Sequence, residues 1–149
     1  MVPAVSEPEA DDLRLRGHSL RTLAWLGDAE FEREVRLRLA RRGDYPTDKL
    51  DKLRARIVNA EAQAALLAEL LAAEVLDEPE QSLVRRGRNT ALRAAGRRSG
   101  TVRDYRAATA LEALIAWWTL AGQHERFEQL IAPAIEARID AMLGVRSAG

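Results

Sequence analysis

The sequence has 149 residues, 47% of them hydrophobic and 31% charged, and its 23 basic side chains balance 23 acidic ones. This composition is typical of one globular domain rather than a disordered chain, and the lack of cysteine excludes disulfides and thiolate metal sites and favours a cytoplasmic setting. The N-terminus lacks a signal-peptide pattern, and the longest uncharged run, residues 113–124, is too short to span a bilayer, so no membrane partner is expected.

The predicted elements are all helical. Residues 1–14 are expected to form a flexible acidic arm, and residues 15–145 a single domain. The first helix is predicted from an N-cap at Ser19 to Ala40, because apolar residues recur at helical spacing. Gly43 and Pro46 then break the chain, and one further helix is predicted from Thr47 or Asp48 to about Val75.

The second half of the chain is also expected to be helical. Residues 77–80 favour a new helix start, because proline and acidic side chains suit the first turn. A flexible basic loop is expected at about 90–101. Thr101 or Asp104 then opens an apolar helix that reaches Leu120, and Pro133 must kink or split a last stretch over residues 125–143.

The charges of the chain are segregated. Residues 61–80 hold six acidic side chains and no basic one, whereas residues 85–106 hold eight arginines and one acid. A dense basic segment can bind a phosphate backbone, although arginine-rich surfaces are more often simply solvated. Tyr105 is the one aromatic residue among these arginines, so recognition of a duplex by its shape fits better than stacking on single-stranded bases.

Two acids interrupt apolar helical sequence. Asp28 follows Gly27, whose cost to helix formation suggests a close approach of another backbone, and Glu112 is the one charge between Arg106 and His124. Carboxylates from two helices can converge on Mg²⁺, which prefers oxygen ligands. The alternative is that each acid lies on the surface beside the core or pairs with a buried arginine.

The aromatic and imidazole side chains are weaker candidates for chemistry. His18 and His124 are expected to be solvated residues near helix ends rather than ligands. The tryptophans are expected to pack in the core or in a dimer interface rather than to bind a cofactor; they are Trp25, Trp117 and Trp118.

Four segments, in order, resemble the Mini-III form of the ribonuclease III family. They are residues 23–29 (Leu-Ala-Trp-Leu-Gly-Asp-Ala), 56–64 (Arg-Ile-Val-Asn-Ala-Glu-Ala-Gln-Ala), 84–89 (Val-Arg-Arg-Gly-Arg-Asn) and 105–115, where Tyr-Arg precedes Thr109 and Leu-Glu-Ala-Leu-Ile. The resemblance covers roughly Leu20 to Ile131, and the order and spacing of the segments make it specific.

The resemblance implies an all-α ribonuclease III catalytic fold that acts as a homodimer on double-stranded RNA. Asp28 and Glu112 match the family's catalytic ligands for Mg²⁺, which Mn²⁺ can replace, and cleavage leaves a 5′-phosphate. The usual substrate is precursor 23S ribosomal RNA; the sequence identifies no assisting ribosomal protein. Mini-III enzymes lack a separate RNA-binding domain, so the catalytic domain must hold the RNA, and the candidate contacts are Lys49, Lys52, Arg85, Arg86, Arg88, Asn89, Arg97 and Arg98.

This chain departs from the family pattern at several positions. Full ribonuclease III carries further acids where this chain has Ala24 and Thr109. Glu30, Leu111 and Ala116 replace an apolar residue, a phenylalanine and a glycine. None of these changes removes a proposed ligand.

Two other functions compete with a nuclease. One is a non-catalytic dimer of the same fold that binds double-stranded RNA, which leaves the two acids without a purpose. The other is a helical protein-interaction module, in which the arginine cluster pairs with the acidic stretch 61–80 within a dimer.

Overall fold

The computed structural model describes residues 17–90 and 101–145. These residues form helices joined by short connections, and the described part contains no strand, as the predicted all-α class requires. None of these helices has the length and apolar character needed to cross a membrane. The expected N-terminal arm, and all but the two ends of the expected basic loop at 90–101, lie outside the described residues.

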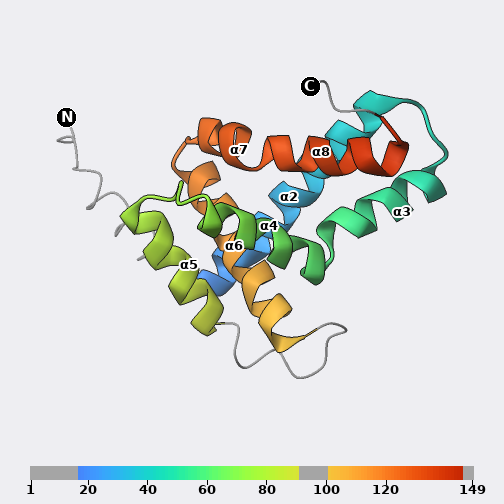
Figure 1. Cartoon of the computed structure of the whole chain (residues 1–149). Coiled ribbons are helices and arrows are strands. Elements are labelled where there is room, and N and C mark those ends of the chain that lie inside the picture. The colour runs from blue at the N-terminus through green and yellow to red at the C-terminus, as the bar shows by residue number, and fades with distance from the viewer. Residues whose placement is uncertain (1–16, 91–100, 146–149) are drawn as a thin grey trace.

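The helices pack into a bundle with α6 in its middle, and α5 and α3 lie on opposite sides of α6 (Figure 1). α6 packs against α2, α5 and α4. The bounds are α2 Leu20–Arg42, α3 Thr47–Val58, α4 Ala60–Ala72, α5 Glu78–Thr90, α6 Val102–Leu120, α7 His124–Leu130 and α8 Ala132–Leu143.

The central helix explains why the core holds together. Most of α6 is buried, from Ala107 through Trp118, with Glu112 as its one partly exposed position. Because alanine alternates with large apolar residues, neighbouring helices can approach α6 closely at some points and interlock with bulky side chains at others. The largest side chains closed off from solvent include Leu23, Phe31, Leu111, Leu114 and Trp118.

Hydrogen bonds at the helix starts confirm three of the predicted boundaries. The Ser19 hydroxyl accepts a bond from the amide of Thr22, and Thr101, rather than Asp104, caps α6. Asp77 and Glu80 cap α5 reciprocally, since each backbone amide donates to the other's carboxylate at 2.9 Å. Neither Thr47 nor Asp48 caps α3, because its N-cap residue is Pro46 and no side chain bonds to the amides of its first turn.

The single helix predicted from residue 47 to about 75 is wrong. Asn59 adopts an extended conformation that ends α3, and its side chain accepts a 2.7 Å hydrogen bond from the amide of Ala62 at the start of α4. Asparagine favours this N-cap position because it satisfies an amide that has no partner within the helix. The break at residue 133 was expected, and it falls between α7 and α8, with proline in the first turn of α8.

An ion-pair network fastens the C-terminal helices to α2. Arg38, which is buried, donates to Glu34 in its own helix and to Glu128 on α7 at 3.0 and 3.1 Å. Arg42 contacts Glu136 and Asp140 on α8, each at 2.7 Å. The hydrogen bonds that Arg42 donates to these carboxylates raise the pKa of Arg42, which favours its charged form.

Candidate active site

The centre of the site is the point where α2 crosses α6. Gly27 is buried there, and a Cβ atom in its place would lie 1.7 Å from the backbone oxygen of Glu112. No side chain fits into that space, so glycine allows the two backbones to touch. This contact confirms the close approach expected from Gly27.

The contact places the two candidate ligands at the same crossing. Asp28 follows Gly27 directly on α2 and is exposed, whereas Glu112 on α6 is partly buried. The apolar neighbours expected around Asp28 therefore do not enclose it. Water reaches this carboxylate, which suits Mg²⁺ because that ion keeps several of its waters when proteins bind it.

A second close crossing brings α5 against α6 only two residues away. Gly87 is buried, and a Cβ atom there would lie 2.8 Å from the Cα of Ala110. This contact fixes α5, with the arginines on either side of Gly87, against the same part of α6. The sequence did not single out Gly87 as a contact, although its position among helix-forming arginines was a signal of the same kind as Gly27.

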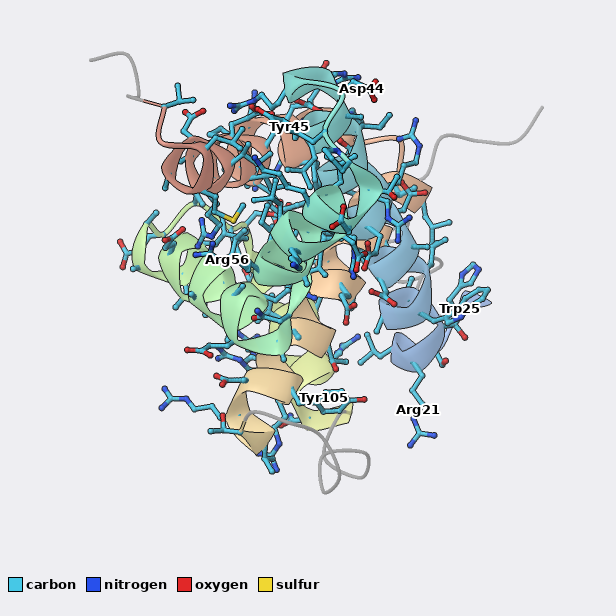
Figure 2. The ribbon with its side chains drawn as sticks, turned by 90° about the vertical axis from the view of Figure 1, so that its right-hand side faces the viewer. Arg21, Trp25, Asp44, Tyr45, Arg56 and Tyr105 are labelled. Carbon is cyan, nitrogen blue, oxygen red and sulfur yellow. The ribbon has the colours of Figure 1, made fainter. Side chains whose placement is uncertain are left out.

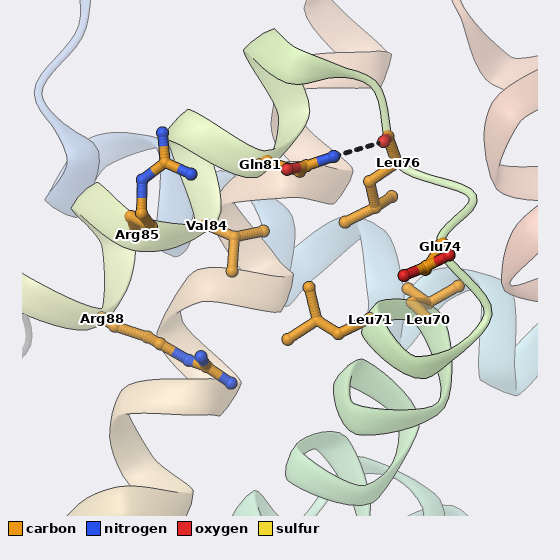
Figure 3. A pocket seen from close by; sticks show the side chains of 8 residues that line it. All are labelled: Leu70, Leu71, Glu74, Leu76, Gln81, Val84, Arg85 and Arg88. Atoms are coloured by element: carbon orange, nitrogen blue, oxygen red, sulfur yellow. Dashed lines mark hydrogen bonds between the residues drawn. The ribbon is translucent and has the colours of Figure 1, made fainter.

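The candidate RNA contacts on α5 form two stripes. All four side chains are exposed; those of Arg85 and Arg88 share one stripe, and those of Arg86 and Asn89 the next. Arg85 and Arg88 line a groove of about 310 Å³ between α5 and the end of α4, where Leu71 and Val84 form part of the floor (Figure 3).

The lysine candidates lie elsewhere. Lys49 and Lys52 are exposed on α3, which lies across the molecule from α5 (Figure 1), and the ammonium of Lys49 stands 4.4 Å from the ring centre of Tyr45. One subunit therefore does not join the lysines and the α5 arginines into one patch. Arg97 and Arg98 lie outside the described residues.

Sequence reasoning missed one polar cluster. Glu34, His124 and Glu128 bring three potential ligand atoms within 4.8 Å of one another. The spacing of His124 and Glu128, four residues apart on one helix, was the available signal. Nothing in the local sequence indicated that α2 would add Glu34.

The acidic stretch 61–80 makes its ion pairs with the C-terminal helices. Glu80 pairs with Arg126, and Glu69 with Arg138 at 3.3 Å. These two acids therefore have basic partners within one subunit. This pairing removes part of the reason for a protein-interaction module.

Fold and site together define a family. Residues 21–123 match the model of the ribonuclease III domain. The chain belongs to the ribonuclease III domain family and is an endoribonuclease.

Its relatives indicate a narrower group within that family. The chain is 44% identical to the Mini-ribonuclease 3 of Symbiobacterium thermophilum over 77% of its own length and 86% of the relative's. Identity to the Mini-ribonuclease 3 of Brevibacillus brevis is 39%, over 75% and 81% of the two chains. The crystal structure of protein FN1578 from Fusobacterium nucleatum is similar at a TM-score of 0.73 and 33% identity, covering 83% of this chain and 97% of that one.

Proposed function

We propose that the chain cuts double-stranded RNA in a metal-dependent reaction, with Asp28 and Glu112 as the metal ligands. The observation that carries this proposal is the backbone contact between Gly27 and Glu112, which sets both carboxylate-bearing residues at one helix crossing. A protein that only bound RNA would gain nothing from two acids beside its phosphates. Negative charge is useful there if a cation stands between the acids and the RNA.

Mg²⁺ is the proposed ion, with Mn²⁺ able to substitute. The donor set fits, because two carboxylates are hard oxygen ligands and Asp28 is open to the waters that Mg²⁺ retains. A bound Mg²⁺ supplies Lewis-acid chemistry toward a phosphodiester, and hydrolysis leaves a 5′-phosphate. The carboxylates of Asp28 and Glu112 hold the ion at the crossing.

The RNA is proposed to lie across α5. Arg85, Arg86 and Arg88 offer exposed guanidinium groups to phosphate oxygens, and Asn89 adds an amide donor. Lys49 and Lys52 lie too far away to share these contacts within one subunit, so they are proposed to contact a more distant part of a long duplex. Arg97 and Arg98 complete the proposed basic surface.

The functional unit is proposed to be a homodimer. Trp25 is 76% exposed on α2, one turn before Asp28 (Figure 2), while Trp117 and Trp118 are buried in the core. The tryptophans were expected in the core or in an interface, and the interface is the role that remains for Trp25. Burying so large an apolar side chain in a dimer interface lowers the free energy of the protein in water. A dimer contact there also brings two cutting sites to one duplex.

The biological substrate is proposed to be precursor 23S ribosomal RNA in the cytoplasm. This proposal rests on the resemblance to Mini-III enzymes and on the absence of cysteine. Incubating the protein with a transcript of the precursor's paired ends tests it: cleavage within that stem, in preference to an unrelated duplex, is the expected result.

The first experiment uses a long, perfectly paired RNA, with Mg²⁺ or with excess chelator, on a denaturing gel. We expect the wild type to cleave the RNA in the presence of Mg²⁺ and not in the presence of the chelator. For Asp28→Asn and Glu112→Gln we expect a cleavage rate at least about 100-fold lower, with unchanged folding. Asp44→Asn is the matched control, because Asp44 is an exposed aspartate far from Trp25 and the start of α2 (Figure 2).

Other results separate the competing functions. Wild-type rates in either ligand variant would show that the metal site is wrongly assigned. A gel shift without cleavage of any duplex would favour the non-catalytic RNA-binding dimer. Weak association that does not change with salt would favour the protein-interaction module, because phosphate binding by arginine is strongly salt-dependent.

A further inference from the structure

Three side chains with metal-ligand chemistry meet where α7 packs against α2. The Nε2 atom of His124 lies 3.0 Å from Oε1 of Glu128 and 3.9 Å from Oε1 of Glu34. We propose that Glu34, His124 and Glu128 bind one divalent transition-metal ion, at a site separate from the Asp28–Glu112 crossing. The two sites lie about 10 Å apart along α6, because Thr119 beside the cluster is two turns beyond Glu112.

The cluster is held in place by Arg38. Its guanidinium bonds to the second oxygen of Glu34 and to both oxygens of Glu128, which leaves Oε1 of Glu34 turned toward the imidazole. Carboxylates that ligate metals usually have such hydrogen-bonding support, because it fixes their orientation. Arg33 approaches Oε1 of Glu34 at 3.4 Å, but its side chain is 63% exposed and can turn into solvent when an ion arrives.

The space beside Glu34 and His124 has the size of an ion. A niche of about 10 Å³ is lined by Glu30, Glu34, Thr119 and His124, together with apolar residues of α6 and α7, and Glu128 stands next to it rather than in its lining. This volume accommodates one water-sized particle and no organic ligand. Glu30 and Thr119 add oxygen-bearing side chains to the lining of the niche, and the Thr119 hydroxyl donates to the backbone oxygen of Ile115.

The donor set selects the kind of metal. An imidazole nitrogen with two carboxylates suits Zn²⁺, Co²⁺ or Ni²⁺ better than Mg²⁺, which prefers oxygen alone. The two proposed sites therefore differ in metal preference. The imidazole must be neutral to bind, so affinity is expected to fall when the medium becomes acidic.

An ion at this position would fasten α7 to α2. Glu34 is nine-tenths buried on α2, while the exposed side chains of His124 and Glu128 belong to a helix of seven residues. Because a ligand that binds only the folded state stabilises it, the ion is expected to raise the unfolding temperature.

The test is a Zn²⁺ titration of the chelator-treated full chain against a chromophoric competitor. Imidazole NMR signals are followed in parallel, which is practical because the chain has two histidines. We expect one ion per chain when the Asp28–Glu112 site is disabled by Asp28→Asn, a shift of the His124 signals with His18 unchanged, and a higher unfolding temperature. His124→Ala should weaken binding at least about 10-fold, in keeping with the loss of one of three ligands.

His18→Ala is the matched control and should bind Zn²⁺ as the wild type does, and Asp28→Asn should keep the ion that shifts the His124 signals. The chain without metal is expected to stay folded in His124→Ala, because that side chain is 61% exposed. Unchanged binding in His124→Ala, lost binding in Asp28→Asn, or no binding at all would each overturn the proposal. The titration is independent of nuclease activity, so its failure would leave the proposed function untouched.

Discussion

Gly27 and Glu112 touch through their backbones, and a methyl group on Gly27 would stand 2.4 Å from the carbonyl carbon of Glu112 as well as 1.7 Å from its oxygen. Carbon atoms that are not bonded attract each other best at about 3.5–4.0 Å, so the space cannot hold any side chain. The separation of α2 and α6 is therefore set by a residue that has no side chain. Asp28 takes its position relative to α6 from that separation.

Replacing Gly27 with alanine should force the helices apart. Overpacking of this kind costs about 1–3 kcal/mol, and here a backbone group rather than a flexible side chain must move. We expect the free energy of unfolding in urea to fall by at least that amount. We also expect RNA cleavage to fall at temperatures where the variant is still folded, because the proposed ligands Asp28 and Glu112 move with their helices.

Gly17→Ala is the control for this prediction. No atom lies within 4 Å of a Cβ built at Gly17, so that variant should keep its stability to within about 0.5 kcal/mol and its full cleavage rate. If Gly27→Ala were as stable and active as Gly17→Ala, the tight crossing between α2 and α6 would not exist in solution.

Trp25→Ala tests the proposed dimer. The side chain is 76% exposed in one subunit, so its removal should change the stability of an isolated subunit little. In an interface, the loss of a buried tryptophan often weakens association by about 2 kcal/mol or more, which is roughly 30-fold in the dissociation constant. Sedimentation over a concentration series should show dimers of the wild type and monomers of the variant.

Leu120→Ala is the comparison, because Leu120 is another exposed apolar residue and lies at the end of α6. Its dissociation constant should match that of the wild type. An equal loss of dimer in both variants would mean that exposed apolar area in general, and not Trp25, drives association.

Local signals made the fold class and much of the site predictable. Ser19 and Thr101 could be identified as caps because their oxygens satisfy amides three residues onward, and Pro133 had to interrupt a helix because it lacks an amide proton. Gly27 indicated a close contact for the same kind of reason. In each case the residue type restricts its own backbone.

Long-range packing decided what could not be predicted. The apolar spacing continues through Asn59, so the break between α3 and α4 leaves no gap in the pattern and depends on how both helices pack on their neighbours. Glu34 and His124 are 90 residues apart and meet because α7 folds back onto α2. Asp28 looked enclosed because its neighbours along the helix are apolar, but the face it occupies points to solvent.

Glu74→Gly should stabilise the protein. Glu74 ends α4 with a φ of 54°, and within the described residues it is the one non-glycine position with positive φ. A left-handed conformation costs an ordinary residue about 1–2 kcal/mol, and glycine avoids this cost. Glycine also increases the conformational entropy of the unfolded chain, which cancels part of the gain. We expect a net gain of about 0.5–1 kcal/mol in chemical unfolding. Ala73→Gly, at a residue with ordinary helical φ, should lose stability instead.

Glu80 should make the stability of the protein sensitive to acid. Burial alone would raise the pKa of this carboxyl group, but hydrogen bonds from Arg126, the Asp77 amide and the Trp118 indole at 2.6 Å outweigh it and lower the pKa. The carboxylate therefore stabilises the fold above its unfolded-state pKa, about 4.3, and this stabilisation is lost as the pH falls through the lower folded-state value.

Glu80→Gln should remove that dependence by removing the charge. At pH 7 we expect the free energy of unfolding to fall by about 2–3 kcal/mol, because the buried group keeps its shape but the guanidinium of Arg126 loses its partner. Between pH 5 and pH 3 the difference between variant and wild type should shrink, as followed by tryptophan fluorescence in urea. Glu78→Gln, an exposed neighbour on the same helix, should follow the wild type at every pH. A constant difference across the pH range would mean that packing around Glu80, rather than its charge, provides the stabilisation.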